Sequence, residues 1–99
     1  MNTTSPNNTV VVTRHESLVE YLREIRLISE DTPVISHANP EQIQGKDVIG
    51  VLPLSLAVLA HSVTEIPLKL TPEDRGKELS LERVKEIARS PKTYYITSQ

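Results

Sequence analysis

Two stretches of this chain, residues 9–13 and 48–52, consist almost entirely of apolar and β-branched side chains. A strand without a polar face has to be covered on both sides, which is typical of parallel sheets that lie between helices. Weaker strand patterns occur at residues 33–37, 64–70 and 93–97, with helical patterns between most of them. This alternation predicts an α/β domain: a small Rossmann-like open sheet, mostly parallel, with four or five strands and helices on both faces.

The helical segments have recognisable ends. Ser17 and Glu20 stand three residues apart, as in a capping box, so we expect a helix with Ser17 as its N-cap that ends between residues 27 and 30. Two further helices are expected over residues 54–60 and 81–89, where apolar side chains recur at helical spacing.

Other segments are less regular. Pro67 lies inside the fourth predicted strand and favours a sheet edge or a bulge there. The Asn39-Pro40 pair and the residues around Gly45 are typical of turns. Residues 93–97 form either a fifth strand or an arm that packs on a partner.

Composition excludes several function classes. The chain has three Tyr and no Phe or Trp, too few aromatic side chains for a platform that stacks several bases. Its formal net charge of −2 disfavours binding to DNA by general phosphate neutralisation. The absence of Cys excludes disulfides and zinc–thiolate sites.

The sequence also predicts how the chain is organised and where it works. Residues 1–8 are polar and without periodicity, so we expect a disordered leader followed by a single domain over residues 9–99. The longest apolar run, residues 51–60, is too short to span a bilayer, and no secretory signal is recognisable. We therefore expect a cytoplasmic protein without a membrane partner.

Candidate site residues follow from the rule that open α/β sheets bind ligands at the carboxyl ends of their strands. Arg14, His15 and Ser17 follow the first strand. Arg14 is a forked cation, a histidine can carry a proton near neutral pH, and the start of the next helix offers free N–H groups to a phosphate. The alternative interpretation is a solvated charge and an ordinary capping or surface histidine. Composition alone slightly favours that alternative, and the position at the carboxyl end of the strand makes the two interpretations about equal.

Two more segments belong to that edge. Pro53 and Ser55 follow the third predicted strand, and Arg75, Gly76 and Lys77 follow a predicted single helical turn, where Gly76 can adopt a left-handed conformation. Each has a structural alternative: a proline-started core helix with a capping serine, and a solvated turn.

The three histidines do not predict a metal site, because no acidic ligand has matching spacing with His15 or His37. His61 is expected on the opposite edge, in a structural role. No cofactor motif is recognisable either. Neither a metal nor a cofactor is therefore expected.

Three sequence blocks together carry a resemblance to a known family. They are Val-Val-Val-Thr-Arg-His at residues 10–15, Asp-Val-Ile-Gly-Val-Leu-Pro-Leu-Ser-Leu-Ala at 47–57, and Arg-Gly-Lys-Glu-Leu at 75–79. In order and spacing they resemble a small family of CRISPR-accessory proteins found beside type III effector genes. The chain departs from that pattern in three places: Glu16-Ser17 replaces Pro-Gly, Lys46 separates Gly45 from Asp47, and Ser55 replaces Asn.

The resemblance implies a ring nuclease that switches off type III CRISPR antiviral signalling. The implied ligand is a cyclic oligoadenylate, cyclic tetra-adenylate above all, bound across a homodimer whose two-fold axis matches that of the ring. The implied reaction needs no metal: a ribose 2′-hydroxyl attacks the adjacent phosphate and leaves a 2′,3′-cyclic phosphate.

The resemblance also suggests roles for the candidate residues. Arg14 and Arg75 would stabilise phosphate charge, and His15 would carry a proton or act as a positioning donor. Ser17 and Ser55 would bind phosphate or ribose. Two alternatives stay open: a protein that binds the ring without cutting it, and an interaction subunit whose contact surface includes the tyrosine pair at residues 94 and 95.

Overall fold

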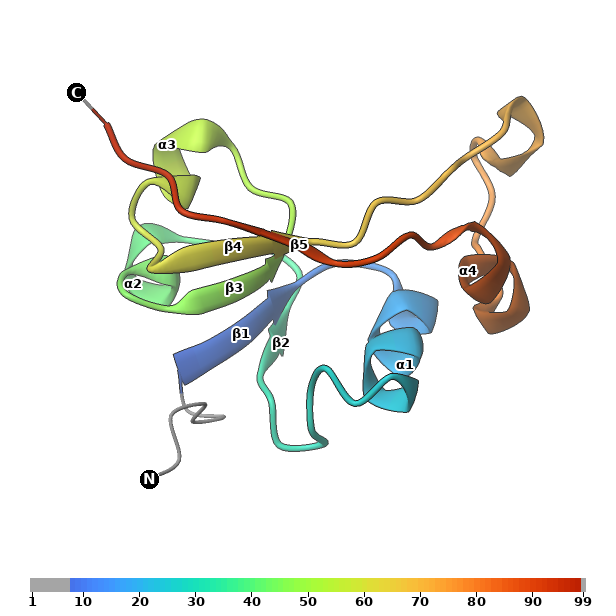
Figure 1. The fold of residues 1–99 in the computed structure, drawn as a ribbon, viewed down its shortest axis with the longest axis horizontal. Coiled ribbons are helices and arrows are strands. Elements are labelled where there is room, and N and C mark those ends of the chain that lie inside the picture. The colour runs from blue at the N-terminus through green and yellow to red at the C-terminus, as the bar shows by residue number, and fades with distance from the viewer. Residues whose placement is uncertain (1–7, 99) are drawn as a thin grey trace.

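The structure is a computed structural model that describes residues 8–98 of the chain. Five strands and four α-helices alternate along residues 8–98, and the 3-10 turn η2 precedes the last helix (Figure 1). In chain order the elements are β1 (Thr9–Val12), α1 (Glu16–Glu24), β2 (Val34–Ile35), α2 (Pro40–Ile43), β3 (Asp47–Gly50), α3 (Leu54–Ala57), β4 (Ser62–Glu65), η2 (Pro72–Asp74), α4 (Leu81–Ile87) and β5 (Lys92–Tyr94). Of the predicted leader, only Asn8 belongs to the described residues.

The strands form one sheet in the order β2-β1-β3-β4-β5. β1 is parallel to β2 and β3, β3 is parallel to β4, and β5 is antiparallel to β4 at the edge. This confirms the predicted mostly parallel α/β sheet. The chain moves outward from β1 to β2 and then returns to β3 on the other side of β1, so the order reverses between β1 and β3.

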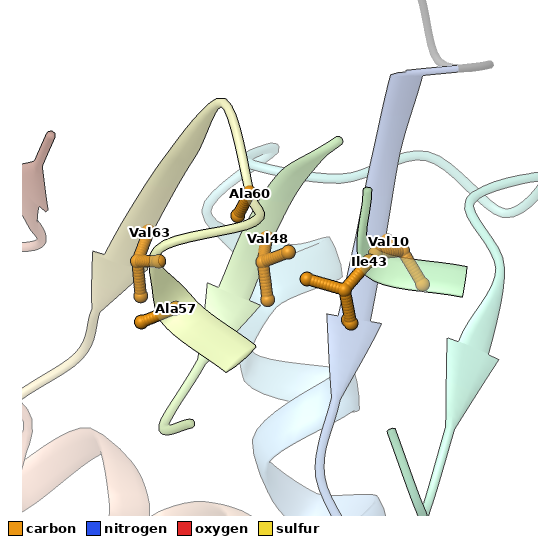
Figure 2. Close-up of a cluster of buried hydrophobic side chains, with 6 residues drawn as sticks. All are labelled: Val10, Ile43, Val48, Ala57, Ala60 and Val63. Carbon is orange, nitrogen blue, oxygen red and sulfur yellow. The ribbon is translucent and has the colours of Figure 1, made fainter. Parts of the chain in front are cut away.

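The sheet has a hydrophobic core on each face. On one face, valines from three strands pack against α2, α3 and the residues after α3 (Figure 2); this cluster is Val10, Ile43, Val48, Ala57, Ala60 and Val63. On the other face, the neighbouring strand residues pack against α1 and the loops beside it; this cluster is Val11, Val19, Leu22, Ile28, Ile49 and Ile66. Since successive strand residues point to opposite faces, the consecutive apolar residues of β1 and β3 contribute to both cores: Val10 and Val48 to one, Val11 and Ile49 to the other.

The first helix differs from its prediction at both ends. Its N-cap is His15 and not Ser17. The Thr13 hydroxyl accepts a hydrogen bond from the His15 N–H at 3.1 Å, and the helix begins at the next residue, Glu16. The helix ends at Glu24 because Arg26 adopts a left-handed conformation, with φ of 62°. The N–H groups of Arg26 and Leu27 then bond the carbonyls of Arg23 and Leu22, a Schellman motif that closes the helix.

Other segments also differ from their predictions, and the predicted helix over residues 54–60 ends at Ala57. Residues 40–43, predicted as a turn, form α2, because Asn39 Oδ1 accepts the Gln42 N–H at 2.9 Å and Pro40 suits the first helical position. β4 ends at Glu65, well before residue 70, because Pro67 has no N–H for the sheet. The chain then leaves the sheet and makes a single bridge from Leu68 to Ala88.

The C-terminal segment belongs to the chain's own sheet. β5 pairs with β4 through the register Val63 to Tyr94 and Thr64 to Thr93, and the Thr64 and Thr93 hydroxyls are 2.8 Å apart. Of the two alternatives, a fifth strand is therefore the observed one.

Candidate functional site

Two adjoining cavities lie beside the start of α1, and the larger of them is at the carboxyl ends of β1 and β3, where the strand order reverses. The larger, about 360 Å³, is bounded by the ends of both strands. The smaller, about 230 Å³, lies between the start of α1, the chain after β4, the η2 loop and α4. His15, Leu18 and Leu68 line both. The larger cavity lies at the place where open α/β sheets bind ligands.

Most of the predicted site residues meet here. His15, Ser17, Arg75, Gly76 and Lys77 all line the smaller cavity, although more than fifty residues separate the two groups in the sequence. Arg14 lines the larger cavity next to it. The tertiary structure thus unites two of the three candidate segments.

The third segment is separate. Pro53 and Ser55 line neither of these two cavities. Both are exposed at the start of α3, a helix of four residues on the opposite face of the sheet from α1. Their part in ligand binding stays a prediction.

The N-terminus of α1 is open to a ligand. His15 is the N-cap, and its side chain makes no capping hydrogen bond. The N–H groups of Glu16 and Ser17, at the first two positions of the helix, have no carbonyl acceptor within the helix. The Ser17 hydroxyl is buried and is the one buried side-chain polar atom without a hydrogen-bond partner among the described residues. Unpaired donors at a helix start favour an anion.

Three cations surround this helix start. Arg14, Arg75 and Lys77 are exposed, and none of them makes an ion pair within residues 8–98. In contrast, Arg83 and Lys85 on α4 are both paired with carboxylates. Three cations without an ion pair in the described part of the chain therefore lie beside the cavities, on a chain of net charge −2.

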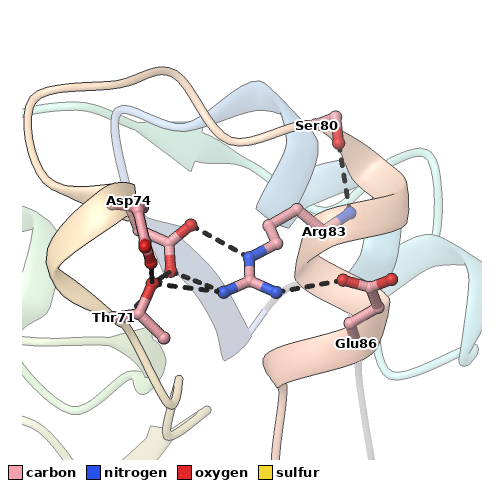
Figure 3. Close-up of polar contacts among 6 residues, drawn as sticks. Thr71, Asp74, Ser80, Arg83 and Glu86 are labelled. Atoms are coloured by element: carbon pink, nitrogen blue, oxygen red, sulfur yellow. Dashed lines mark hydrogen bonds and ion pairs between the residues drawn. The ribbon is translucent and has the colours of Figure 1, made fainter.

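A clasp between η2 and α4 holds the loop that carries two of these cations. Arg83 donates from Nε to Asp74 Oδ1 at 2.9 Å and from Nη2 to Asp74 Oδ2 at 2.8 Å, and the Thr71 N–H also donates to Asp74 at 2.8 Å (Figure 3). Arg83 Nη1 bonds Glu86, and the Ser80 hydroxyl caps α4 by accepting the Arg83 N–H. Since Arg75 directly follows Asp74, the clasp fixes the start of the loop over the cavity.

The clasp predicts a pH effect on stability. Hydrogen bonds from Arg83 and from the Thr71 N–H hold the pKa of Asp74 well below its usual range. A carboxyl whose folded pKa is lowered stabilises the fold fully above the ordinary aspartate value of about 3.9 and loses that contribution as the pH falls below it. Asp74→Asn should therefore lower the melting temperature near neutral pH, and its difference from the wild type should shrink on acidification.

Thermal melts of wild type and Asp74→Asn from about pH 7 to about pH 3 would measure this difference. Arg83→Gln, which removes the other half of the clasp, should flatten the same part of the profile. Parallel pH profiles for the wild type and both variants would contradict the assignment.

Sequence reasoning missed a glycine at the larger cavity. Gly50 ends β3 with φ of 143°, and a Cβ there would collide with the Val12 carbonyl oxygen of β1. The close approach of the two strand ends thus depends on a residue without a side chain. A glycine inside an apolar strand is the sequence signal that could have indicated this close approach of two backbones.

A second polar cluster lies at the opposite end of the strands. His61 Nδ1 is 2.8 Å from Asp47 Oδ1, the Ser62 hydroxyl donates to the same oxygen at 2.8 Å, and the Tyr95 ring packs edge-on against His61. Burial raises the pKa of Asp47, but the bonds from His61 and Ser62 outweigh it and lower the pKa overall. These contacts join β3, β4 and the chain after β5, which is the structural role expected for His61.

Within the described part of the chain, no group of three or more His, Cys, Asp or Glu side chains could hold a metal ion. Nor do residues 8–98 contain a helix with the length and apolarity needed to cross a bilayer.

One comparison with known proteins gives a match. A family model described as "Putative CRISPR-associated protein (Cas_VVA1548)" matches residues 10–97, which include all three sequence blocks and every residue of the two cavities. No curated protein and no solved structure matches the chain.

Proposed function

Because this chain belongs to the CRISPR-associated family Cas_VVA1548, we propose that it is a ring nuclease of type III CRISPR signalling. In this proposal it binds cyclic tetra-adenylate and cleaves it without a metal, which removes the second messenger and ends the antiviral response. It works in the cytoplasm, where that messenger is made.

The observation that carries the proposal is the convergence of an open helix start and unpaired cations on one pair of cavities. His15 and Ser17 come from the start of α1, Arg75 and Lys77 from the loop after η2, and Arg14 from the end of β1. Free N–H groups and cations favour phosphate, and their position at the switch between β1 and β3 is the usual nucleotide-binding position in such sheets.

The proposed reaction uses the nucleophile that RNA itself carries. The ribose 2′-oxygen attacks the adjacent phosphorus, the new P–O2′ bond forms, and the P–O5′ bond breaks. The 2′-hydroxyl loses its proton and the departing 5′-oxygen gains one, so the product is linear, with a 2′,3′-cyclic phosphate and a 5′-hydroxyl. The protein has to hold the 2′-oxygen in line and stabilise the charge on phosphorus. Arg14 and Arg75 supply that charge stabilisation, and His15 carries the proton.

A homodimer completes the site in this proposal. One chain presents a single helix start and a single cation group, whereas a ring of four nucleotides has two equivalent halves. Two copies related by a two-fold axis would bind both halves through the same residues.

A second candidate is a protein that binds the ring without cutting it. One observation favours it: among residues 8–98, no carboxylate contacts the His15 ring, so no hydrogen bond or ion pair in the described part orients it. Binding needs only the cations and the helix start, whereas cleavage also needs in-line geometry.

The test is to incubate the purified protein with cyclic tetra-adenylate and a chelator, and to resolve the products by chromatography and mass. Linear fragments that end in a cyclic phosphate are the expected result. Intact ligand that elutes with the protein would support the binder instead. Intact ligand that does not bind, whatever the ring size, would contradict both and favour an interaction subunit whose exposed Tyr94 and Tyr95 contact a partner.

A further inference from the structure

We propose that the smaller cavity holds an adenine base of the bound nucleotide, while the phosphates remain at the exposed cations outside it. The inference rests on the proposed function and adds to it the place, and the means, of base recognition. It is carried by the size of the cavity, its apolar walls, the buried Ser17 hydroxyl and the position of the cations.

The cavity has the size and the lining of a base pocket. Its volume is about 230 Å³, and an apolar cavity of about 150 Å³ accommodates a benzene-sized ring. Aliphatic side chains from four segments form its walls; they are Leu18, Leu68, Leu70, Leu79 and Val84. A flat purine ring buries most of its surface in such a space.

Recognition in this cavity uses no aromatic stacking. None of the chain's three tyrosines lines it, although base-binding proteins often stack the base on an aromatic ring. Here the base would lie between branched aliphatic side chains, which contact both of its faces through dispersion. Shape then matters more than it does on an open stacking platform.

The polar side chains of Ser17 and Asp74 line the cavity. The Ser17 hydroxyl, 8% exposed as a residue, has no hydrogen-bond partner. A buried hydroxyl without a partner is unfavourable, and a serine hydroxyl can both donate and accept. A purine edge offers ring nitrogens that accept and, in adenine, an amino group that donates. Asp74 also lines the cavity, and its carboxylate is already held by Arg83.

The distribution of charge around the cavity determines which end of the nucleotide enters it. The lining residues that are buried or half-buried are mostly apolar, whereas His15, Arg75 and Lys77 are exposed. Arg14 lines the adjoining cavity, which His15 also borders. A nucleotide has the same polarity, with an uncharged base at one end and a phosphate at the other. The base therefore lies inside and the phosphate at the rim, next to the start of α1.

The first variant fills the cavity. Leu79 is half-buried, so Leu79→Phe can add volume to the cavity without replacing a fully buried residue. Affinity is measured by calorimetry with cyclic tetra-2′-deoxyadenylate, which lacks the attacking hydroxyl and stays intact. We expect Leu79→Phe to weaken binding at least tenfold. The matched control is Ile35→Phe, which fills a cavity of about 190 Å³ beside β2 and α2 and should leave the affinity within twofold of the wild type.

The second variant separates ligand recognition from folding. Ser17→Ala removes the unpartnered hydroxyl, so the free protein should melt at the same temperature as the wild type or higher. The same change should weaken ring binding three- to tenfold, because the base loses a hydrogen-bond partner. A merely structural serine would instead lower the melting temperature and leave the affinity unchanged. This variant keeps the test decisive even where Leu79→Phe does not fold.

The outcomes distinguish the two proposals. A wild type that binds no cyclic oligoadenylate contradicts the proposed function and this inference together. A wild type that binds and cleaves the ring, with Leu79→Phe and Ser17→Ala equal to it in affinity, leaves the proposed function in place and overturns the base pocket. An equal loss of affinity in Ile35→Phe also overturns it.

Discussion

Gly50→Ala is expected to destabilise this protein strongly, although the substitution adds only one methyl group. The added Cβ would collide with the Val12 carbonyl oxygen, and Gly50 has a φ of 143° that L side chains rarely adopt. Overpacking and backbone strain each cost about 1–3 kcal/mol. A domain of this size has about 5–15 kcal/mol of stability in total and loses about 4–8 °C in Tm per kcal/mol. A fall in Tm of more than about 10 °C follows.

The matched control is Gly45→Ala. Gly45 also has a positive φ, 71°, but an added Cβ would have no neighbour within 4 Å. Only the cost of the left-handed conformation remains there, about 1–2 kcal/mol. Thermal or denaturant unfolding of both variants gives two losses of stability, and their difference is the contribution of the collision at Gly50. Equal losses of stability in both would show that the ends of β1 and β3 do not need the glycine.

His15→Ala is expected to lower the rate of ring cleavage about a hundredfold and to leave ring affinity nearly unchanged. General acid–base groups contribute about 10²–10⁴ in rate. His15 makes no side-chain capping bond to α1, so its removal breaks no helix contact and the Tm should stay within about 3 °C of the wild type. Single-turnover cleavage and calorimetry measure the two effects separately.

Two comparisons make that experiment specific. His37→Ala removes another exposed histidine, one that lines neither cavity of the site, and should cleave at the wild-type rate. Arg14→Ala should weaken both binding and cleavage, because a phosphate charge partner acts in the ground state and in the transition state. A His15→Ala variant that cleaves normally would exclude His15 as the proton carrier. Loss of cleavage on adding a chelator would contradict the metal-free mechanism.

The fold was predictable because its main signal is local. Consecutive apolar side chains, residues 10–12 in β1 and residues 48 and 49 in β3, imply a core on both faces, and both cores are present. The mostly parallel arrangement was expected from the alternation of strands and helices, whereas the order of the strands was not. Helix ends were less predictable, because they depend on single contacts. The hydrogen bond to the Thr13 hydroxyl accompanies a start of α1 two residues closer to the N-terminus than predicted. The left-handed conformation of Arg26 ends the same helix earlier than predicted.

The candidate site was predictable only in part. The rule that ligands bind at the carboxyl ends of strands led to the start of α1 and to the loop after η2, which do meet at one cavity. The same rule selected Pro53 and Ser55, whose helix covers the other face. The rule identifies an edge of the sheet, but each edge has two faces, and helix packing decides on which face a loop lies.

The sequence by itself determined the α/β class, the absence of cysteine chemistry, and the residue types that can bind a phosphate near neutral pH. The tertiary structure alone decided which of those residues act together. The Asp74–Arg83 clasp holds the start of the cationic loop to α4, beside the cavity that α1 also lines. The Ser17 hydroxyl is a buried group without a partner instead of a helix cap. The physical reason is that these features depend on contacts between segments far apart along the chain, whereas periodicity reports only on neighbours.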